Sequence, residues 1–170
     1  MYLIISGTNR AGSNTLKVAK EYQRLLKEKS IDSALLSLEG LNLMERDVEF
    51  EKIENELIIP CQHYIFISPE YNGSFPGALK LLFDTGKTHA LWWHKKALLT
   101  GVSTGRAGNL RGMDHLSDVL NHVKVMVHHS KLPISSVDKL MDTEGHFTDA
   151  ATLKAINSQL NEFINWTAGQ

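Results

Sequence analysis

The chain carries near its start the stretch Tyr2-Leu3-Ile4-Ile5-Ser6-Gly7-Thr8-Asn9-Arg10-Ala11-Gly12-Ser13-Asn14, which decides the fold class. Its first four residues form a short apolar run typical of a strand, and Ser6-Gly7 ends that run. Beyond Asn14 the apolar residues recur at helical spacing: Leu16, Ala19, Tyr22 and Leu26. The stretch therefore predicts a strand, a tight loop and an amphipathic helix in succession.

The same succession recurs along the chain. Further strands are expected at Ala34–Leu38, His63–Ser68, Lys96–Ser103 and Val123–Val127. Apolar residues spaced by three or four predict helices around Phe50–Leu57, from Pro76 to Gly86, around Met113–Val123 and from Leu153 to Trp166. Apolar strands that alternate with helices predict a doubly wound α/β fold, with five parallel strands and helices on both faces. We expect one domain over residues 1–170.

Composition narrows the function. A formal charge of −1 provides no field that would gather nucleic acid or anionic lipid, so we expect neither partner. No basic leader follows Met1, and no apolar stretch approaches the roughly 18 residues of a membrane helix, so a cytoplasmic location is expected. Cys61 is the single cysteine, which excludes a disulfide framework or a thiolate cluster. Any redox chemistry must then come from a bound cofactor.

Three polar loops that contain glycine follow predicted strands, at residues 6–14, 69–75 and 103–110. The carboxyl ends of parallel strands lie at one edge of a sheet, where α/β proteins bind their ligands. We therefore expect these loops to converge on one rim and to form the functional site.

The first loop has the features of an anion site. It leads into a helix N-terminus, whose unpaired N–H groups and dipole favour a phosphate. Side chains that can donate hydrogen bonds are Thr8, Arg10, Ser13, Asn14 and Thr15. The lysine of a Walker loop is missing after Gly12, and Asn9 replaces the second glycine of a dinucleotide fingerprint. The ligand that remains for this loop is a single phosphomonoester. In the alternative interpretation, Ser13 or Asn14 is an ordinary N-cap and Gly7 a turn glycine.

The second and third loops carry more specific motifs. They read Pro69-Glu70-Tyr71-Asn72-Gly73-Ser74-Phe75-Pro76-Gly77-Ala78-Leu79-Lys80 and Ser103-Thr104-Gly105-Arg106-Ala107-Gly108. Together with Gly7-Thr8-Asn9-Arg10-Ala11-Gly12-Ser13, these stretches resemble the NADPH-dependent FMN reductase family in order and spacing, with Thr8 in place of that family's first serine. The resemblance covers essentially the whole chain.

The resemblance implies a flavodoxin-like sheet of order 2-1-3-4-5, non-covalently bound FMN, and NADPH or NADH as electron donor. It implies that the phosphate is held by Thr8, Arg10, Ser13, Asn14 and Thr15. The isoalloxazine ring would be bordered by Pro69, Glu70, Tyr71, Asn72, Gly73, Ser103 and Gly105. It further implies reduction of flavins, quinones or similar small acceptors, and a homodimer or homotetramer. Since the cofactor carries the chemistry, no catalytic acid or base is assigned.

Other candidate residues are less specific. Tyr71 either stacks near the ring or packs with a polar tip. His128 and His129 are expected to point to opposite faces of a strand, so we expect no metal site. Trp92-Trp93 forms either core or a subunit contact.

Two other functions compete with an NAD(P)H-dependent flavin reductase. One is a flavodoxin-like electron carrier, although such carriers are usually strongly acidic and this chain has a charge of −1. The other is a flavin-binding sensor without turnover.

Overall fold

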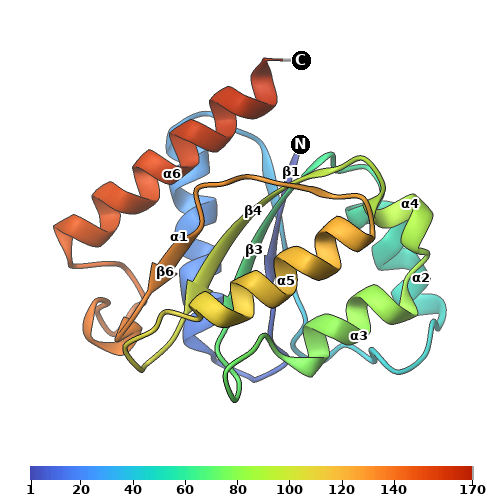
Figure 1. Cartoon of the computed structure of the whole chain (residues 1–170), viewed down its shortest axis with the longest axis horizontal. Helices are drawn as coiled ribbons and strands as arrows, with labels where there is room; N and C mark the ends of the chain where they lie inside the picture. Colours follow the sequence, from blue (N-terminus) through green and yellow to red (C-terminus); the bar gives the residue numbers. More distant parts are fainter. Residues whose placement is uncertain (170) are drawn as a thin grey trace.

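The computed structural model describes residues 1–169, so Gln170, the last residue of the expected domain, lies outside the described residues. Strands and helices alternate along the chain (Figure 1). The strands are β1 (Tyr2–Ser6), β2 (Ser33–Ser37), β3 (His63–Pro69), β4 (Lys96–Val102), β5 (Met126–Val127) and β6 (Leu132–Ile134). The α-helices are α1 (Asn14–Glu28), α2 (Val48–Ile53), α3 (Gly77–Thr85), α4 (Thr88–Trp92), α5 (Leu110–His122) and α6 (Ala150–Ala168).

The strands form one parallel sheet of order β2-β1-β3-β4-β5, with β6 also paired to β4. The register places Ile4 of β1 between Leu35 of β2 and Ile65 of β3. This order is that of the flavodoxin-like fold, and it confirms the predicted fold class.

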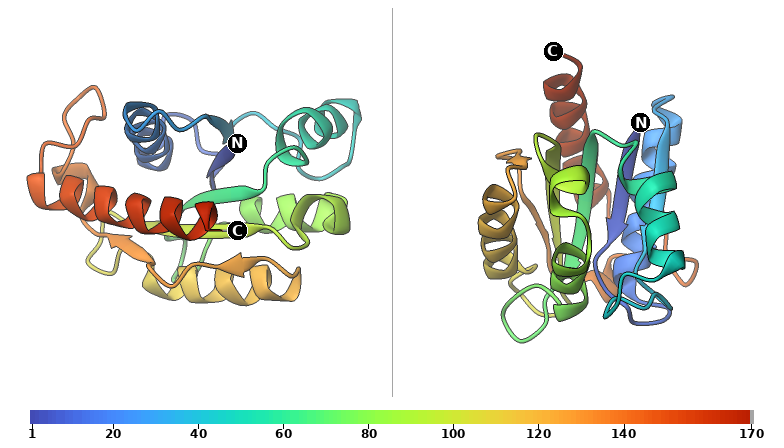
Figure 2. Two further views of the ribbon diagram at one scale, coloured as in Figure 1. Left: turned by 90° about the horizontal axis from the view of Figure 1, so that it is seen from above. Right: turned by 90° about the vertical axis from the view of Figure 1, so that its right-hand side faces the viewer.

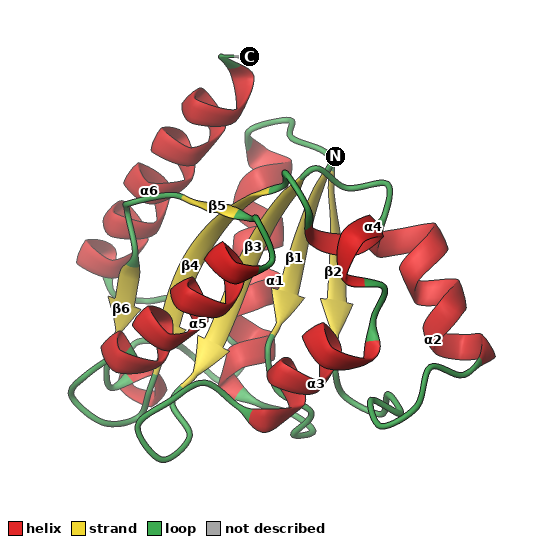
Figure 3. Ribbon diagram, turned by 45° about the vertical axis from the view of Figure 1, so that its right-hand side comes forward, coloured by secondary structure: helices red, strands yellow, loops and turns green. Residues whose placement is uncertain are grey.

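Side chains of each strand alternate between two cores. In β1, Leu3 and Ile5 pack toward α3, α4 and α5, whereas Tyr2 and Ile4 pack toward α1 and α6. The views of Figure 2 show strands between α1 on one side and α5 on the other. In Figure 3, α3, α4 and α5 lie in front of the sheet. Burial of one large apolar side chain stabilises the folded state by roughly 1.5–3 kcal/mol. The helical layers on the two faces therefore both stabilise the sheet by burying its side chains.

The expected fifth strand at 123–127 is wrong in its extent. Helix α5 ends at His122, and Lys124 adopts a left-handed conformation with φ of 60°, so strand pairing begins only at Met126. The strand position beside β4 is completed by β6, which pairs with the other end of β4. Two short strands therefore take the place of the single predicted one.

The break between β5 and β6 also corrects the expectation for His128 and His129. Both residues follow β5 instead of lying within a strand, and their rings stack at a centroid distance of 4.4 Å. They therefore lie on the same side of the chain. Within residues 1–169, no group of three or more His, Cys, Asp or Glu side chains is arranged to hold a metal ion.

Several local expectations are refined. Pro76 is the N-cap of α3, one position before the predicted first turn, and Gly86 ends that helix. Helix α4 was not predicted because it has only five residues. It places Trp92 in the core with no exposure, while Trp93 is half-buried. Core filling is thus the correct interpretation for Trp92.

A buried polar network ties α1 and α6 to the centre of the sheet. The Tyr22 hydroxyl donates to Oε1 of Gln159 at 2.7 Å and lies 2.8 Å from the Thr100 hydroxyl. Nε2 of Gln159 donates to the carbonyl oxygens of Leu99 and Ser130. Burial raises the pKa of Tyr22, which remains a neutral donor. None of the helices in residues 1–169 combines the length and apolarity needed to cross a membrane.

Candidate functional site

The three predicted loops follow the carboxyl ends of β1, β3 and β4, which meet at one edge of the sheet, the lower edge in Figure 3. Parallel register carries all three strands to this edge, so their loops converge there. The sequence-based expectation of a common rim thus follows from the sheet order.

The first and second loops are joined by side chains. The hydroxyl oxygens of Thr8 and Tyr71 lie 2.6 Å apart, and Thr8 is 1% exposed. Oγ1 of Thr8 also accepts from the backbone N–H of Arg10 at 3.3 Å. The Arg10 guanidinium lies 4.6 Å from the centroid of the Tyr71 ring, which is a cation–π arrangement. Three predicted site residues from two loops therefore form one contact.

Ser13 is the N-cap of α1, and its side chain accepts from the backbone N–H of Leu16 at 3.1 Å. Ser13 is therefore an N-cap, as the alternative interpretation held. Its hydroxyl proton remains available to donate a hydrogen bond to a ligand. The backbone N–H groups from Gly12 to Thr15 find no acceptor within residues 1–169. These donors, at the positive end of a helix of 15 residues, form a cradle suited to an anion.

Gly7 allows the first loop to lie against the end of β3. A Cβ atom at this position would be 2.9 Å from Cδ2 of Leu79 and 3.0 Å from the carbonyl oxygen of Ile67. The Gly7 N–H donates to that same carbonyl at 2.8 Å. A larger residue would push the loop away from β3.

The second loop is a tight turn that the chain closes on itself. The backbone N–H groups of Tyr71 and Ser74 donate to each other's carbonyl oxygens at 2.8 and 3.1 Å. Asn72 and Gly73, with φ of 52° and 79°, occupy the two central positions, as the Asn-Gly pair favours in a type I′ turn. This geometry exposes Glu70 and Asn72 at the rim.

The third loop is fixed by Ser103. Its hydroxyl donates to the carbonyl of Gly105 at 3.0 Å and accepts from the N–H of Gly108 at 3.0 Å. Between this loop and the second lies a cleft of about 370 Å³, lined by Glu70, Asn72, Gly73, Ser103, Thr104, Gly105, Arg106 and Ala107. Five predicted site residues therefore share one cleft. Pro69 and Thr15 are instead buried, and Asn14 is half-buried at the start of α1.

Asn109 was missed by the sequence analysis. Its amide nitrogen Nδ2 donates to the carbonyl oxygens of Ser68 and Pro69, at 2.9 and 3.0 Å, and lies 3.2 Å from the Ser68 hydroxyl. Asn109 is 1% exposed and left-handed, with φ of 61°. It fixes the third loop to the end of β3. The available signal was an asparagine after Gly108, since asparagine tolerates this conformation.

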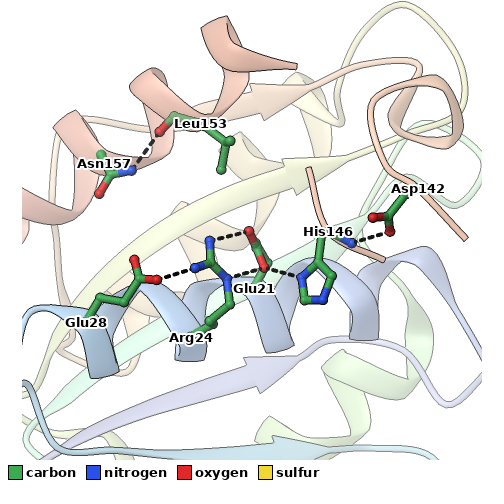
Figure 4. A network of polar contacts seen from close by, with 7 residues as sticks. All are labelled: Glu21, Arg24, Glu28, Asp142, His146, Leu153 and Asn157. Atoms are coloured by element: carbon green, nitrogen blue, oxygen red, sulfur yellow. Dashed lines mark hydrogen bonds and ion pairs between the residues drawn. The ribbon is translucent and has the colours of Figure 1, made fainter. Parts of the chain in front are cut away.

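Helix α1, which starts at the first loop, is held by a charged cluster on its flank (Figure 4). The carboxylate of Glu21, whose side chain is 2% exposed, receives two hydrogen bonds from Arg24, at 2.7 and 2.9 Å. His146 approaches the same carboxylate at 3.2 Å. Burial alone would raise the pKa of Glu21, but hydrogen bonds from Arg24 and His146 outweigh it and lower the pKa. The cluster fastens the segment around His146 to α1.

The fold and this rim define a flavodoxin-like α/β protein with unpaired N–H groups at the start of α1 and a cleft between the second and third loops. The family model of NADPH-dependent FMN reductases matches residues 2–138. The chain therefore belongs to the NADPH-dependent FMN reductase family, as its motifs predicted, and it is an FMN-dependent oxidoreductase that uses NAD(P)H.

Individual relatives agree with this assignment. An NAD(P)H-dependent FMN reductase of Pseudomonas aeruginosa is 28% identical over 172 residues, covering 95% of this chain and 92% of its own length. A quinone reductase of Pseudomonas putida is 30% identical over 121 residues, covering 66% of this chain and 64% of its own. The structure is similar to a flavoenzyme NAD(P)H:acceptor oxidoreductase of Paracoccus denitrificans, with a TM-score of 0.77, 24% identity, and coverage of 97% and 94% of the two chains.

Proposed function

We propose that this protein passes reducing equivalents from NAD(P)H through FMN to quinones or similar small acceptors, with the three loops as the flavin site. The observation that carries the proposal is the juxtaposition at the rim. The free N–H groups at the start of α1 lie on one loop, and Thr8 and Tyr71 connect that loop to the wall of the adjacent cleft. An anion site beside a cleft matches a molecule with a phosphate at one end and a flat ring at the other.

The first loop suits the phosphate. We assign this role to Thr8, Arg10, Ser13, Asn14 and Thr15. Backbone N–H groups supply most of the donors, and the guanidinium of Arg10 adds charge that no carboxylate of residues 1–169 neutralises through an ion pair. The buried Ser6 hydroxyl has no hydrogen-bond partner within residues 1–169, which is consistent with a polar ligand nearby.

The cleft suits the ring. We assign its border to Pro69, Glu70, Tyr71, Asn72, Gly73, Ser103 and Gly105. A flat heterocycle needs backbone donors and acceptors at its polar edge, and the glycines permit close approach of the backbone. When bound, FMN supplies the redox chemistry. The loops bind and orient it, and the residues of the rim align the second substrate.

Assembly and location are part of the proposal. We infer a homodimer or homotetramer and a cytoplasmic location, with a small molecule as electron acceptor. Support comes from the family, whose model matches residues 2–138.

A spectroscopic titration tests the proposal. Purified protein is mixed with FMN while the quenching of flavin fluorescence is followed, and NAD(P)H oxidation is then recorded with and without a quinone. We expect saturable FMN binding and NAD(P)H oxidation that depends on the acceptor. Failure to bind FMN would refute the flavin site. Binding without NAD(P)H oxidation would instead indicate a carrier or a sensor.

A further inference from the structure

The arginines of this chain divide into two groups by their partners. Of the five, Arg24 and Arg46 are paired with glutamates away from the rim. The other three, Arg10, Arg106 and Arg111, form no ion pair with a carboxylate of residues 1–169. All three lie at or beside the rim where the loops converge. The arginines that are not paired with a carboxylate of residues 1–169 therefore all lie at or beside the functional edge of the sheet.

Two of these arginines lie near the cleft instead of the phosphate loop: Arg106 lines it, and Arg111 lies beside Gly73, one of its lining residues. Arg106 lines the cleft from the third loop. Arg111 comes from the first turn of α5, and its Nη1 lies 3.1 Å from the position that a Cβ of Gly73 would occupy. The second and third loops thus each carry an arginine beside them, and neither is needed for a phosphate held at the start of α1.

The neighbouring charges leave these arginines unopposed. Asp114, one turn along α5 from Arg111, is paired with Lys131 at 2.6 Å. His115 is hydrogen-bonded through Nδ1 to the Ser74 hydroxyl at 2.9 Å, so it holds the turn beside Arg111. Glu70 also lines the cleft, but it lies more than 4.0 Å from any arginine nitrogen. Glu70 is thus the one carboxylate among the residues that line the cleft, and it forms no ion pair with Arg106.

We propose that Arg106 and Arg111 form a second anion subsite, which binds an oxyanion group of the substrate that approaches the flavin. The inference rests on the proposed function, since it assumes FMN in the cleft. A planar guanidinium binds phosphate, sulfonate or carboxylate oxygens through two parallel hydrogen bonds. The oxyanion comes from one of two sources: a phosphate of the nicotinamide donor or a charged substituent of the acceptor.

Steady-state kinetics on the FMN-loaded protein test the subsite. The variants are R106Q, R111Q, their double variant, and R111K, which retains the charge. Lys52→Gln is the matched control, because Lys52 lies exposed on α2 and also loses one positive charge. KM is measured for NADPH and NADH, for 2-methyl-1,4-naphthoquinone, which is uncharged, and for a sulfonated naphthoquinone. We expect the double variant to raise KM for the anionic substrate about tenfold, equivalent to ~1.4 kcal/mol.

The pattern identifies the source of the oxyanion. A rise in KM for both nucleotides, or for NADPH alone, with unchanged KM for both quinones, assigns the subsite to the donor. A rise for the sulfonated quinone, but not for the uncharged one, assigns it to the acceptor. R111K should retain part of the affinity for the anionic substrate. Added salt should reduce the difference in KM between the wild type and the double variant.

Other results overturn the subsite. Equal changes in KM for charged and uncharged substrates, or no change, contradict it. A parallel rise in the Kd for FMN, measured by flavin fluorescence, would show that the arginines serve the flavin instead. A wild type that fails to take up FMN or to oxidise NAD(P)H refutes the proposed function, which is a separate outcome.

Discussion

The hydroxyl oxygens of Thr8 and Tyr71 lie 2.6 Å apart and connect the first loop of the rim to the second. The two residues are 63 positions apart in the chain, and the pairing of β1 with β3 brings them together. Arg10 stacks on the same tyrosine ring. The position of the anion cradle relative to the cleft therefore depends on Tyr71.

Replacing Tyr71 with Phe removes this hydrogen bond while keeping the ring on which Arg10 lies. We expect FMN affinity to fall roughly threefold to tenfold, because a single hydrogen bond contributes about 0.5–1.5 kcal/mol. Fluorescence titration measures the Kd. Thr8→Val tests the other partner, and the double variant should lose less than the sum of the two single losses. Fully additive losses would contradict the connection.

A methyl group at Gly7 would collide with Leu79 and with the backbone of β3. Gly7→Ala should destabilise the protein by roughly 1–3 kcal/mol, the usual range for overpacking a tight contact. Urea denaturation followed by circular dichroism measures the free energy of unfolding. Gly77→Ala is the control, because a Cβ there meets nothing within 4 Å. Equal stability of the two variants would show that the loop does not need this close approach.

Loss of the Asn109 side chain should loosen the third loop. Asn109→Ala removes donors to two buried carbonyl groups and places alanine in a left-handed conformation. We expect a loss of roughly 2–4 kcal/mol, since each unsatisfied buried group costs about 1–3 kcal/mol. Thermal and urea unfolding measure the effect, with the exposed Asn121→Ala as the control. A change within about 0.5 kcal/mol, the range of surface substitutions, would contradict the structural role of Asn109.

The Glu21 carboxylate predicts a pH dependence of stability. Because its folded pKa is lowered below the reference value of 4.5, its contribution is present above that value and is lost as the pH falls through the folded pKa. Glu21→Gln should therefore be less stable than the wild type at pH 7, and the difference should shrink below about pH 4.5. Unfolding free energies at several pH values measure it.

The matched control for this prediction is Glu28→Gln. Glu28 also pairs with Arg24, but 58% of its side chain is exposed, and exposed pairs contribute about 0–1 kcal/mol. A difference between wild type and Glu21→Gln that stays constant from pH 7 to pH 3 would contradict the assignment of the effect to carboxylate ionisation.

Much of the fold was predictable because local patterns and global architecture agree. Buried parallel strands need apolar runs, and His63–Pro69 and Lys96–Val102 have them, with the predicted boundaries correct to within one residue. The strand predicted at 123–127 was wrong in its extent, because a short apolar run fits the end of a helix as well as the start of a strand. The left-handed conformation of Lys124 separates helix from strand, and pairing with β4 begins only at Met126.

By itself, the sequence determined the α/β class, the loops that follow β1, β3 and β4, and the family, because these depend on residue types at fixed spacing. The tertiary structure alone decided which residues meet. It joined Thr8 to Tyr71, fixed the third loop through Asn109, and placed Arg106 in the lining of the cleft and Arg111 beside Gly73 of that lining. Residues tens of positions apart approach one another only through the order and register of the sheet, which are set by long-range packing that no local pattern contains.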